Sequence, residues 1–334
     1  MPARITPQNA RPKIGLVLGS GGARGIVHIS ILEALAAMDI PIDFIAGSSI
    51  GAAVAGVHAV GGLPDLKEDL VSMKRENLLK LFDPVLSRSG LFAGKRALAF
   101  LARYIPKTAL IEDLSVPLGI VATDYDSGRA VVFRKGNLLA AIRASVSIPG
   151  IFTPTVSGRS LLLDGGVVDP LPIDVVLSMG ADLTIAVSLH PALGKLGLIP
   201  VKYPGTGKAP GAKAPARVPP VERLIHRLVE NGTAGGNRAL KAADLWLDTQ
   251  RAAADSRRKM PNLFEILTRT IDIMEFANTR LMLASNPPTV LIDFDFPEIP
   301  TLDFTLSAYL LEQGRKAAEA KAPELLKKIK HAAP

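Results

Sequence analysis

Residues 47–51 read Gly-Ser-Ser-Ile-Gly and place Ser49 at the centre of a G-x-S-x-G pentapeptide. An apolar run precedes the pentapeptide and a run of small residues follows it, which is the order strand, tight turn, helix. A serine on such a turn has an exposed hydroxyl near a helix N-terminus, where negative charge is favoured. Gly47 and Gly51 suit a turn too sharp for a Cβ. The pentapeptide predicts either a serine nucleophile or a turn that lets a helix pack closely on a sheet.

Two residues are candidates for the base that would activate Ser49. Asp164 ends an apolar run and is followed by Gly165 and Gly166, which leave space around its carboxylate. A carboxylate in partly apolar surroundings has a raised pKa and is a better base. His190 completes the order Ser, Asp, His of α/β-hydrolases, but a proline-rich segment follows it directly. Asp164 is the favoured base, although its position also suits a turn residue or a helix N-cap.

A second glycine-rich segment, Gly19 to Gly25, lies between a predicted strand and a predicted helix. It fails the dinucleotide pattern G-x-G-x-x-G, because its third glycine comes one residue late, and it lacks the Lys and Ser/Thr of a phosphate-binding loop. Consecutive glycines before a helix leave backbone N–H groups free to bind an anion. The segment predicts an oxyanion hole at Gly21, Gly22 and Ala23, in which one donor is worth about 10² to 10³ in rate. A loop that merely tightens the connection is the alternative.

The composition excludes several classes of protein. The 334 residues are 48% hydrophobic and 5% aromatic, with a mean hydropathy of +0.27, which is typical of an aliphatic-rich folded chain. There is no cysteine, so disulfides and thiolate metal sites are excluded. No apolar window reaches the roughly 18 residues of a membrane-spanning helix, and the first residues lack the apolar core of a secretory signal. We expect a cytoplasmic protein.

Strand and helix patterns alternate along the chain. Aliphatic runs predict strands at 13–18, 42–47, 116–123, 130–133, 161–163, 183–189 and 289–294. Helical spacing of apolar residues predicts helices at 26–35, 52–57, 65–82, 94–105, 137–145, 172–179, 220–230, 236–258, 262–285 and 304–330. The helix at 220–230 is basic and amphipathic, and it suits either a membrane surface or packing on the core. This alternation predicts an α/β fold with three layers, α/β/α, around a mainly parallel central sheet.

The positive charge is concentrated in one segment. The chain has a net charge of +8, and residues 191–260 hold 13 Lys/Arg against 5 Asp/Glu. Seven prolines and five glycines at 191–220 predict a flexible basic loop. The loop separates a catalytic core at 12–190 from a helical part at 221–334. One strand of the helical part is expected to return to the sheet of the core, so both belong to the same domain. The charge predicts peripheral contact with an anionic membrane through 191–260. Nucleic acid is the less favoured partner, because few aromatic residues are present to stack on bases.

Four motifs together resemble one family. They occur in the order and spacing of the patatin-like phospholipases, and they are Ser20 to Gly25, Gly47 to Gly51, Ala144 to Pro149, and Asp164 to Gly166. The resemblance is closest to the bacterial branch related to neuropathy target esterase. It implies a Ser-Asp dyad without histidine, with Ser49 as nucleophile and Asp164 as base. It also implies that the glycine loop forms the oxyanion hole and that Arg24 stiffens this loop.

The resemblance covers residues 12–190 well and the remainder loosely. Ser20 departs from the glycine common in the family, and the basic segment after His190 is a larger departure. The implied activity is that of a lipid acyl hydrolase of the phospholipase A, lysophospholipase or carboxylesterase type, peripheral at the membrane surface and without a metal or organic cofactor. The alternative is a lipid-binding or regulatory protein that keeps the fold without turnover.

Overall fold

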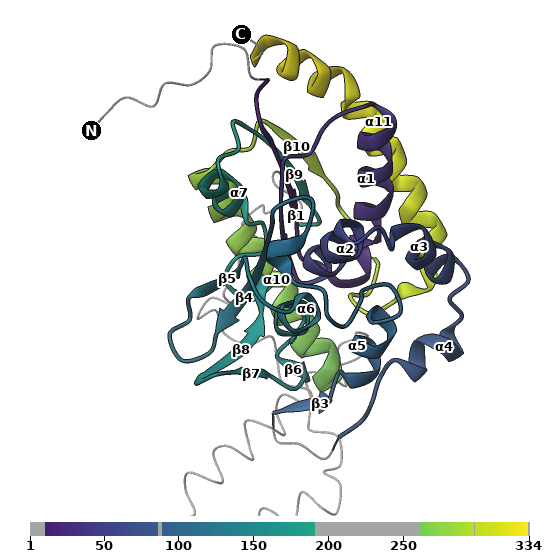
Figure 1. Cartoon of the computed structure of the whole chain (residues 1–334). Coiled ribbons are helices and arrows are strands. Elements are labelled where there is room, and N and C mark those ends of the chain that lie inside the picture. Colours follow the sequence, from purple (N-terminus) through teal and green to yellow (C-terminus); the bar gives the residue numbers. More distant parts are fainter. Residues whose placement is uncertain (1–10, 86–88, 191–260, 297, 333–334) are drawn as a thin grey trace, which may run out of the picture. The chain divides into compact units, whose positions relative to one another are not determined.

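The computed structural model describes residues 11–85, 89–190, 261–296 and 298–332 (Figure 1). Contacts divide the chain into two units, Met1–Gly194 with Leu267–Pro334, and Lys195–Ile266. The sequence predicted a core at 12–190, a loop at 191–220 and a C-terminal part at 221–334 that belongs to the same domain as the core. The elements below belong to the first unit, except for the first turn of the helix that begins at Leu263. The predicted basic loop and the rest of 191–260 lie outside the described residues.

A mainly parallel sheet forms the centre of the first unit. Five parallel strands lie in the order β10, β9, β1, β2, β4. Their bounds are β1 Ile14–Leu18, β2 Phe44–Ser48, β4 Leu118–Asp124, β9 Leu183–Ser188 and β10 Val290–Asp293. Three antiparallel strands complete the sheet: β5 Ala130–Phe133 and β8 Ser160–Asp164 each pair with β4, and β7 Thr155–Ser157 pairs with β8. A separate parallel pair joins β3 Gly90–Phe92 to β6 Gly150–Phe152.

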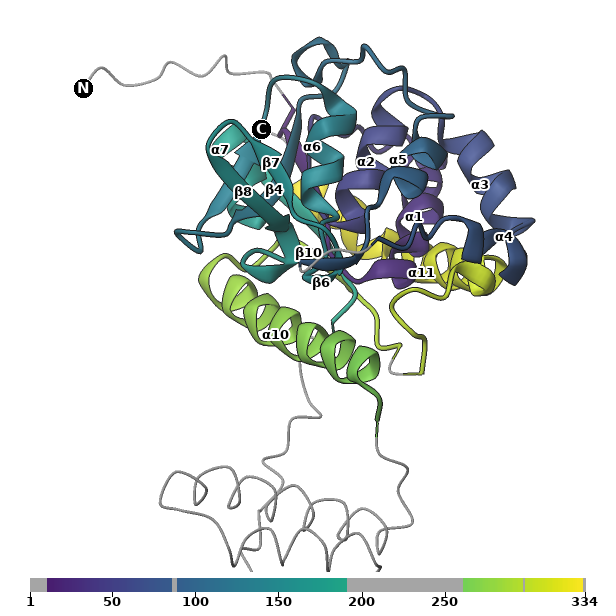
Figure 2. The same cartoon turned by 90° about the horizontal axis from the view of Figure 1, so that it is seen from below.

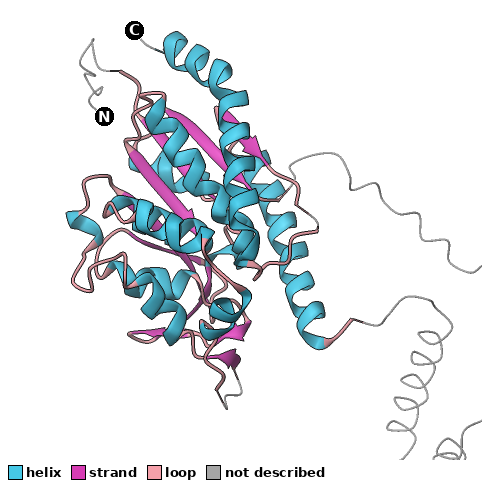
Figure 3. Ribbon diagram, turned by 90° about the vertical axis from the view of Figure 1, so that its right-hand side faces the viewer, coloured by secondary structure: helices cyan, strands magenta, loops and turns pink. Residues whose placement is uncertain are grey.

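Helices cover both faces of this sheet (Figures 1 and 3). Leu16 and Leu18 of β1 pack into the larger core, whose helices are α1 Val27–Ala37, α2 Ile50–Ala59, α3 Leu63–Val71, α6 Leu138–Ser145 and α11 Ser307–Ala332. Val17, between them, packs into the second core with α7, Ile173–Met179. Alternate residues of one strand thus enter two cores, as the pleat of a strand requires. The predicted three-layer α/β/α fold with a mainly parallel sheet is confirmed.

The helical pattern at 65–82 proves to contain two helices. α3 ends at Val71 and α4 covers Arg75–Lys80, because Lys74 is extended with φ −93° and ψ 155°. Regular spacing of leucines continues across such a break, so the sequence could not locate it. α5, Lys95–Leu101, and α10, Leu263–Ser285, complete the helices that bear on the site. Within the described residues, no helix is both long enough and apolar enough to cross a membrane.

Candidate active site

One edge of β4 brings the ends of β2 and β8 together. Val121 pairs with Ser48, the last residue of β2, and the next residue of β4, Ala122, pairs with Asp164, the last residue of β8. β5 occupies the opposite edge of β4 at both positions, so β2 and β8 share an edge and point toward each other. Because Ser49 directly follows Ser48, its side chain meets that of Asp164 across a separation of 115 residues in the sequence.

Ser49 and Asp164 form a buried hydrogen-bonded pair. Ser49 Oγ donates to Asp164 Oδ2 at 2.6 Å, and the two residues are 4% and 2% exposed. Ser49 has φ 54° and ψ −120°, a conformation that residues with a Cβ rarely adopt. Its backbone N–H donates to Ser145 Oγ at 2.9 Å, which helps to hold the turn. A strained serine between a strand and the first residue of α2 has the geometry of a nucleophile elbow.

The glycines around this pair lie where the backbone approaches too closely for a side chain. A Cβ on Gly51 would lie 2.0 Å from Leu18 O, and a Cβ on Gly47 would lie 2.6 Å from the backbone of Gly51. On the other side, a Cβ on Gly165 would lie 2.3 Å from Val121 O. Gly47 and Gly51 therefore allow the elbow to turn sharply and to pack on β1, and Gly165 allows the turn after β8 to pack on β4 and on Ser48.

Backbone hydrogen bonds and burial determine the orientation and the pKa of the Asp164 carboxylate. Gly166 N–H donates to Asp164 Oδ1 at 2.8 Å, and Thr123 Oγ1 donates to the Asp164 carbonyl at 2.7 Å. Burial, and after it the negative charge of Glu275, raise the pKa of Asp164 well above 3.8, while the bonds from Ser49 and Gly166 oppose this rise. A carboxylate with a raised pKa is a stronger base toward a serine hydroxyl.

The predicted oxyanion loop reaches the same cavity as Ser49. Gly21 and Gly22 have φ 145° and 59°, and Gly22 lines the cavity. Ala23 N–H donates to Thr301 O at 2.7 Å, so this predicted donor is engaged in the fold. The N–H groups of Gly21 and Gly22 have no backbone acceptor within the described part of the chain. The structure thus leaves two of the three predicted donors available.

Arg24 ties the oxyanion loop to α10 and to the segment after β10. Its Nη2 donates to both carboxylate oxygens of Asp272, at 2.8 and 2.9 Å, and to Thr301 Oγ1 at 3.1 Å. Its Nε donates to Ile299 O at 3.2 Å. Arg24 is 7% exposed, and a buried guanidinium with this many partners restrains the loop that carries it. Asp272 lies 248 residues further along the chain and was not predicted.

The two buried histidines among the described residues, His190 and His28, have partners other than Ser49. His190 Nε2 lies 2.9 Å from Glu275 Oε2, in a pair that is buried on both sides. His28 Nε2 lies 2.9 Å from Gly19 O, and burial lowers the pKa of His28 to about 4. The order Ser, Asp, His in the sequence therefore has no matching triad in space.

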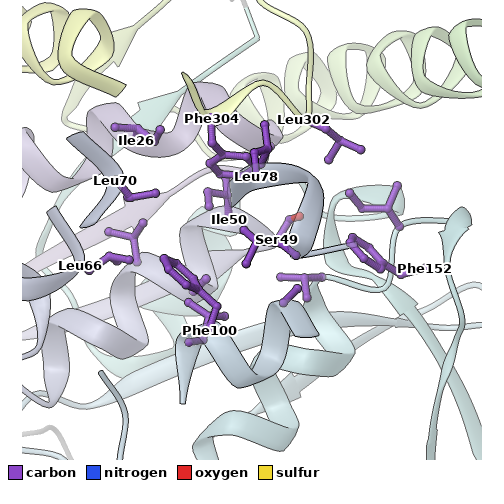
Figure 4. A pocket seen from close by; sticks show the side chains of 18 of the residues that line it. Ile26, Ser49, Ile50, Leu66, Leu70, Leu78, Phe100, Phe152, Leu302 and Phe304 are labelled. Atoms are coloured by element: carbon purple, nitrogen blue, oxygen red, sulfur yellow. The ribbon is translucent and has the colours of Figure 1, made fainter. Parts of the chain in front are cut away.

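An apolar cavity of about 140 Å³ opens on Ser49, whose hydroxyl is the one polar side-chain group among the described residues that line it (Figure 4). Helices α2, α3, α4 and α5 supply much of the lining, with Ile50, Leu66, Leu70, Leu78 and Phe100 among its residues. Phe152 of β6 and Leu302 and Phe304 of the segment after β10 also line it. These last contributions could not be predicted, because apolar residues from distant segments carry no motif.

Comparison with known proteins identifies the family. Residues 16–177 match the family described as Patatin-like phospholipase. An NTE family protein of Mycobacterium tuberculosis is 34% identical over 346 residues, which covers 93% of this chain and 91% of that protein. The chain belongs to the patatin-like phospholipase family. The predicted relation of this patatin-like phospholipase to the NTE branch is confirmed.

Other patatin-like phospholipases match a shorter part of the chain. Patatin-like phospholipase domain-containing protein 7 of Rattus norvegicus is 37% identical over 197 residues, which covers 56% of this chain and 14% of that protein. Protein 6 of the same series, from Homo sapiens, is 32% identical over 193 residues, with the same two coverages. These matches support lipid hydrolysis as the general activity of the family to which this chain belongs.

Proposed function

We propose that this protein is a serine lipid acyl hydrolase in which Ser49 is the nucleophile and Asp164 its base. The observation that carries the proposal is the 2.6 Å hydrogen bond from Ser49 Oγ to Asp164 Oδ2, made where an apolar cavity opens. A cavity with one polar group in an apolar lining suits the acyl chain of a lipid, with its ester carbonyl at Ser49. The proposed substrates are fatty acyl esters, as in phospholipase A, lysophospholipase or carboxylesterase reactions.

The reaction begins when Ser49 Oγ attacks the ester carbonyl and its proton passes to Asp164 Oδ2. The negative charge that develops on the carbonyl oxygen is stabilised by the N–H groups of Gly21 and Gly22. Collapse of the tetrahedral intermediate breaks the ester C–O bond, and the alcohol leaves with the proton from Asp164. Water then gives a proton to Asp164 and attacks the acyl-enzyme, which releases the fatty acid and returns the proton to Ser49.

The central test is the hydrolysis of a p-nitrophenyl acyl ester by two variants. Ser49→Ala removes the nucleophile and is expected to reduce the rate to background. Asp164→Asn removes the base and is expected to lower kcat by about 10² to 10⁴, the usual contribution of general base catalysis. Ser157→Ala and Asp126→Asn make the same changes at exposed positions and are expected to keep the wild-type rate.

The two proposed roles can fail separately. A near-wild-type rate in Asp164→Asn would contradict the dyad, even if Ser49→Ala were inactive. A wild-type protein whose Ser49 is not labelled by a fluorophosphonate would instead support lipid binding without turnover. Circular dichroism of each variant shows whether the fold is kept.

We further propose that the basic segment 191–260 brings the enzyme to an anionic lipid surface. Its 13 Lys/Arg against 5 Asp/Glu, together with an acyl ester as proposed substrate, support this placement. Lipid substrates reside in membranes, so an enzyme acting on them gains from a charged segment that raises its concentration at that surface.

A further inference from the structure

One side of α10 contacts the segments that build the active site. Asp272, Glu275 and Asn278 follow one another at three-residue spacing, which places them on the same side of a helix. They contact, in turn, the glycine loop, the end of β9 and the turn after β8. Figure 2 shows α10 passing below the end of the sheet near β6 and β10. This helix is therefore placed to restrain the catalytic loops.

Glu275 and His190 form the most deeply buried of these contacts. His190 Nε2 and Glu275 Oε2 are 2.9 Å apart, and the two residues are 4% and 5% exposed. A carboxylate buried to this extent needs a hydrogen-bonding partner, because an unpaired one is strongly destabilising. The mechanism proposed above uses neither residue. Their burial next to the site calls for a role other than direct contact with substrate, since neither lines the cavity.

The second oxygen of Glu275 lies against the turn that holds the base. A Cβ on Gly166 would lie only 2.1 Å from Glu275 Oε1, so the carboxylate packs directly on that glycine. Gly166 in turn supplies the N–H that binds Asp164 Oδ1 at 2.8 Å. Glu275 is thus one residue removed from the base, and any larger residue at Gly166 would displace it.

We propose that Glu275, held in place by His190, is a positioning residue for Asp164. Its carboxylate fixes the turn that orients the base, and its negative charge makes the ionised form of Asp164 more reactive toward the Ser49 proton. The inference rests on the proposed function, because Asp164 accepts a proton only if Ser49 attacks a substrate.

The proposed effect of the Glu275 charge agrees with the raised pKa of Asp164. The charge of Glu275 is the second cause, after burial, of the raised pKa of Asp164. Like charges in a buried site favour the protonated form, and base strength rises with the pKa. The ionisable groups shown to interact with Glu275 are His190 and Asp164, and on the same side of α10 Asp272 is paired with Arg24.

Glu275→Gln tests the role, because glutamine keeps the shape and a hydrogen bond to His190 but carries no charge. The acid limb of the kcat/KM profile, which reports Asp164, is expected to move to lower pH by about one unit. The rate on the plateau is expected to fall about threefold as the base weakens. KM is expected to stay unchanged, because Glu275 does not line the cavity.

His190→Gln is the complementary variant. It replaces the rigid imidazole donor by a flexible amide, so the hydrogen bond that offsets the charge of Glu275 is weaker, and the acid limb is expected to move to higher pH. Opposite shifts in the two variants cannot arise from a general loss of packing. If Glu275→Gln fails to fold, the shift of the acid limb in His190→Gln still tests whether Glu275 acts on Asp164.

Glu312→Gln provides the charge-matched control. Glu312 forms an exposed ion pair with Arg315 on α11, and its substitution is expected to leave the acid limb in place. Profiles are measured both by ester hydrolysis and by the rate of fluorophosphonate labelling of Ser49. Active variants with unshifted acid limbs would overturn the positioning role and leave the dyad intact. A wild-type protein that neither hydrolyses esters nor reacts with the probe would overturn both proposals.

Discussion

Two buried aspartates near the end of β8 show how surroundings give one residue type different properties. Asp164 is 2% exposed and its two oxygens bind Ser49 and Gly166. Asp169 is 5% exposed, and its Oδ1 has no hydrogen-bond partner in the described part of the chain. Burial, and after it the charge of Asp174, raise the pKa of Asp169 to about 7. The first carboxylate has the hydrogen-bond partners expected of the proposed base, whereas the second loses its proton only around pH 7, at a cost to stability.

Asp169→Asn is expected to stabilise the protein at alkaline pH. The pKa of Asp169 rises from 3.8 to about 7 on folding, so between these values the folded state binds more protons than the unfolded state. The free energy of unfolding of the wild type therefore falls as pH rises, by up to about 1.4 kcal/mol per pH unit from this group. Asparagine removes the dependence, so the advantage of the variant grows from about pH 4 to 7 and then stays level.

Urea unfolding at several pH values measures this difference. Asp126→Asn, at an exposed position, is the control and is expected to give the same difference from wild type at each pH. A variant at Asp169 whose stability relative to wild type does not change with pH would show that the carboxyl titrates at its ordinary value.

Among the helices and strands, those that depend on local residue patterns could be predicted from the sequence. The elbow at 47–51 and the turn at 164–166 follow apolar runs, so strand ends with reactive side chains could be expected to meet at one edge of the sheet. The antiparallel direction of β8 could not be read from its few residues. Asp272 and Glu275 were missed because their partners are distant in the sequence, although two acids within the apolar stretch 271–277 are a signal of buried pairing.

Helix α3 lines a part of the cavity whose shape can be changed by substitution without altering Ser49 or Asp164. Leu66 and Leu70 line the side away from Phe152 (Figure 4). Leu66→Trp is expected to shorten the space for an acyl chain, because tryptophan fills volume that methylene groups would occupy. The ratio of rates on p-nitrophenyl dodecanoate and butyrate is expected to fall about tenfold, since one or two displaced methylenes are worth this much in an apolar pocket.

The ratio of the two rates is measured on one protein sample, so it does not depend on the fraction of enzyme that is folded. Leu79→Trp is the matched control, because Leu79 is 63% exposed on α4 and does not line the cavity. An unchanged ratio in Leu66→Trp would mean that the acyl chain lies elsewhere.

Across the whole molecule, the distribution of charge agrees with the proposed docking on an anionic surface. The whole chain has 39 Lys/Arg and 31 Asp/Glu, and the excess falls within 191–260, where 13 Lys/Arg stand against 5 Asp/Glu. The remaining chain is balanced, so the core has little net attraction for an anionic surface. Each basic side chain near such a surface contributes about 1 kcal/mol, and salt weakens the attraction over a Debye length of about 8 Å.

Liposome flotation tests this distribution. The wild type is expected to float with vesicles rich in phosphatidylserine at low salt, and to float less with neutral vesicles or at high salt, because the attraction is electrostatic. Replacing the five basic residues of 191–220 by glutamine is expected to weaken flotation on anionic vesicles. The matched control replaces five lysines of α11, namely Lys316, Lys321, Lys327, Lys328 and Lys330, and is expected to float as the wild type does. Equal flotation of the wild type on both vesicle types, or an equal loss in both variants, would contradict docking through the basic segment and would place lipid contact on the apolar surface around the cavity.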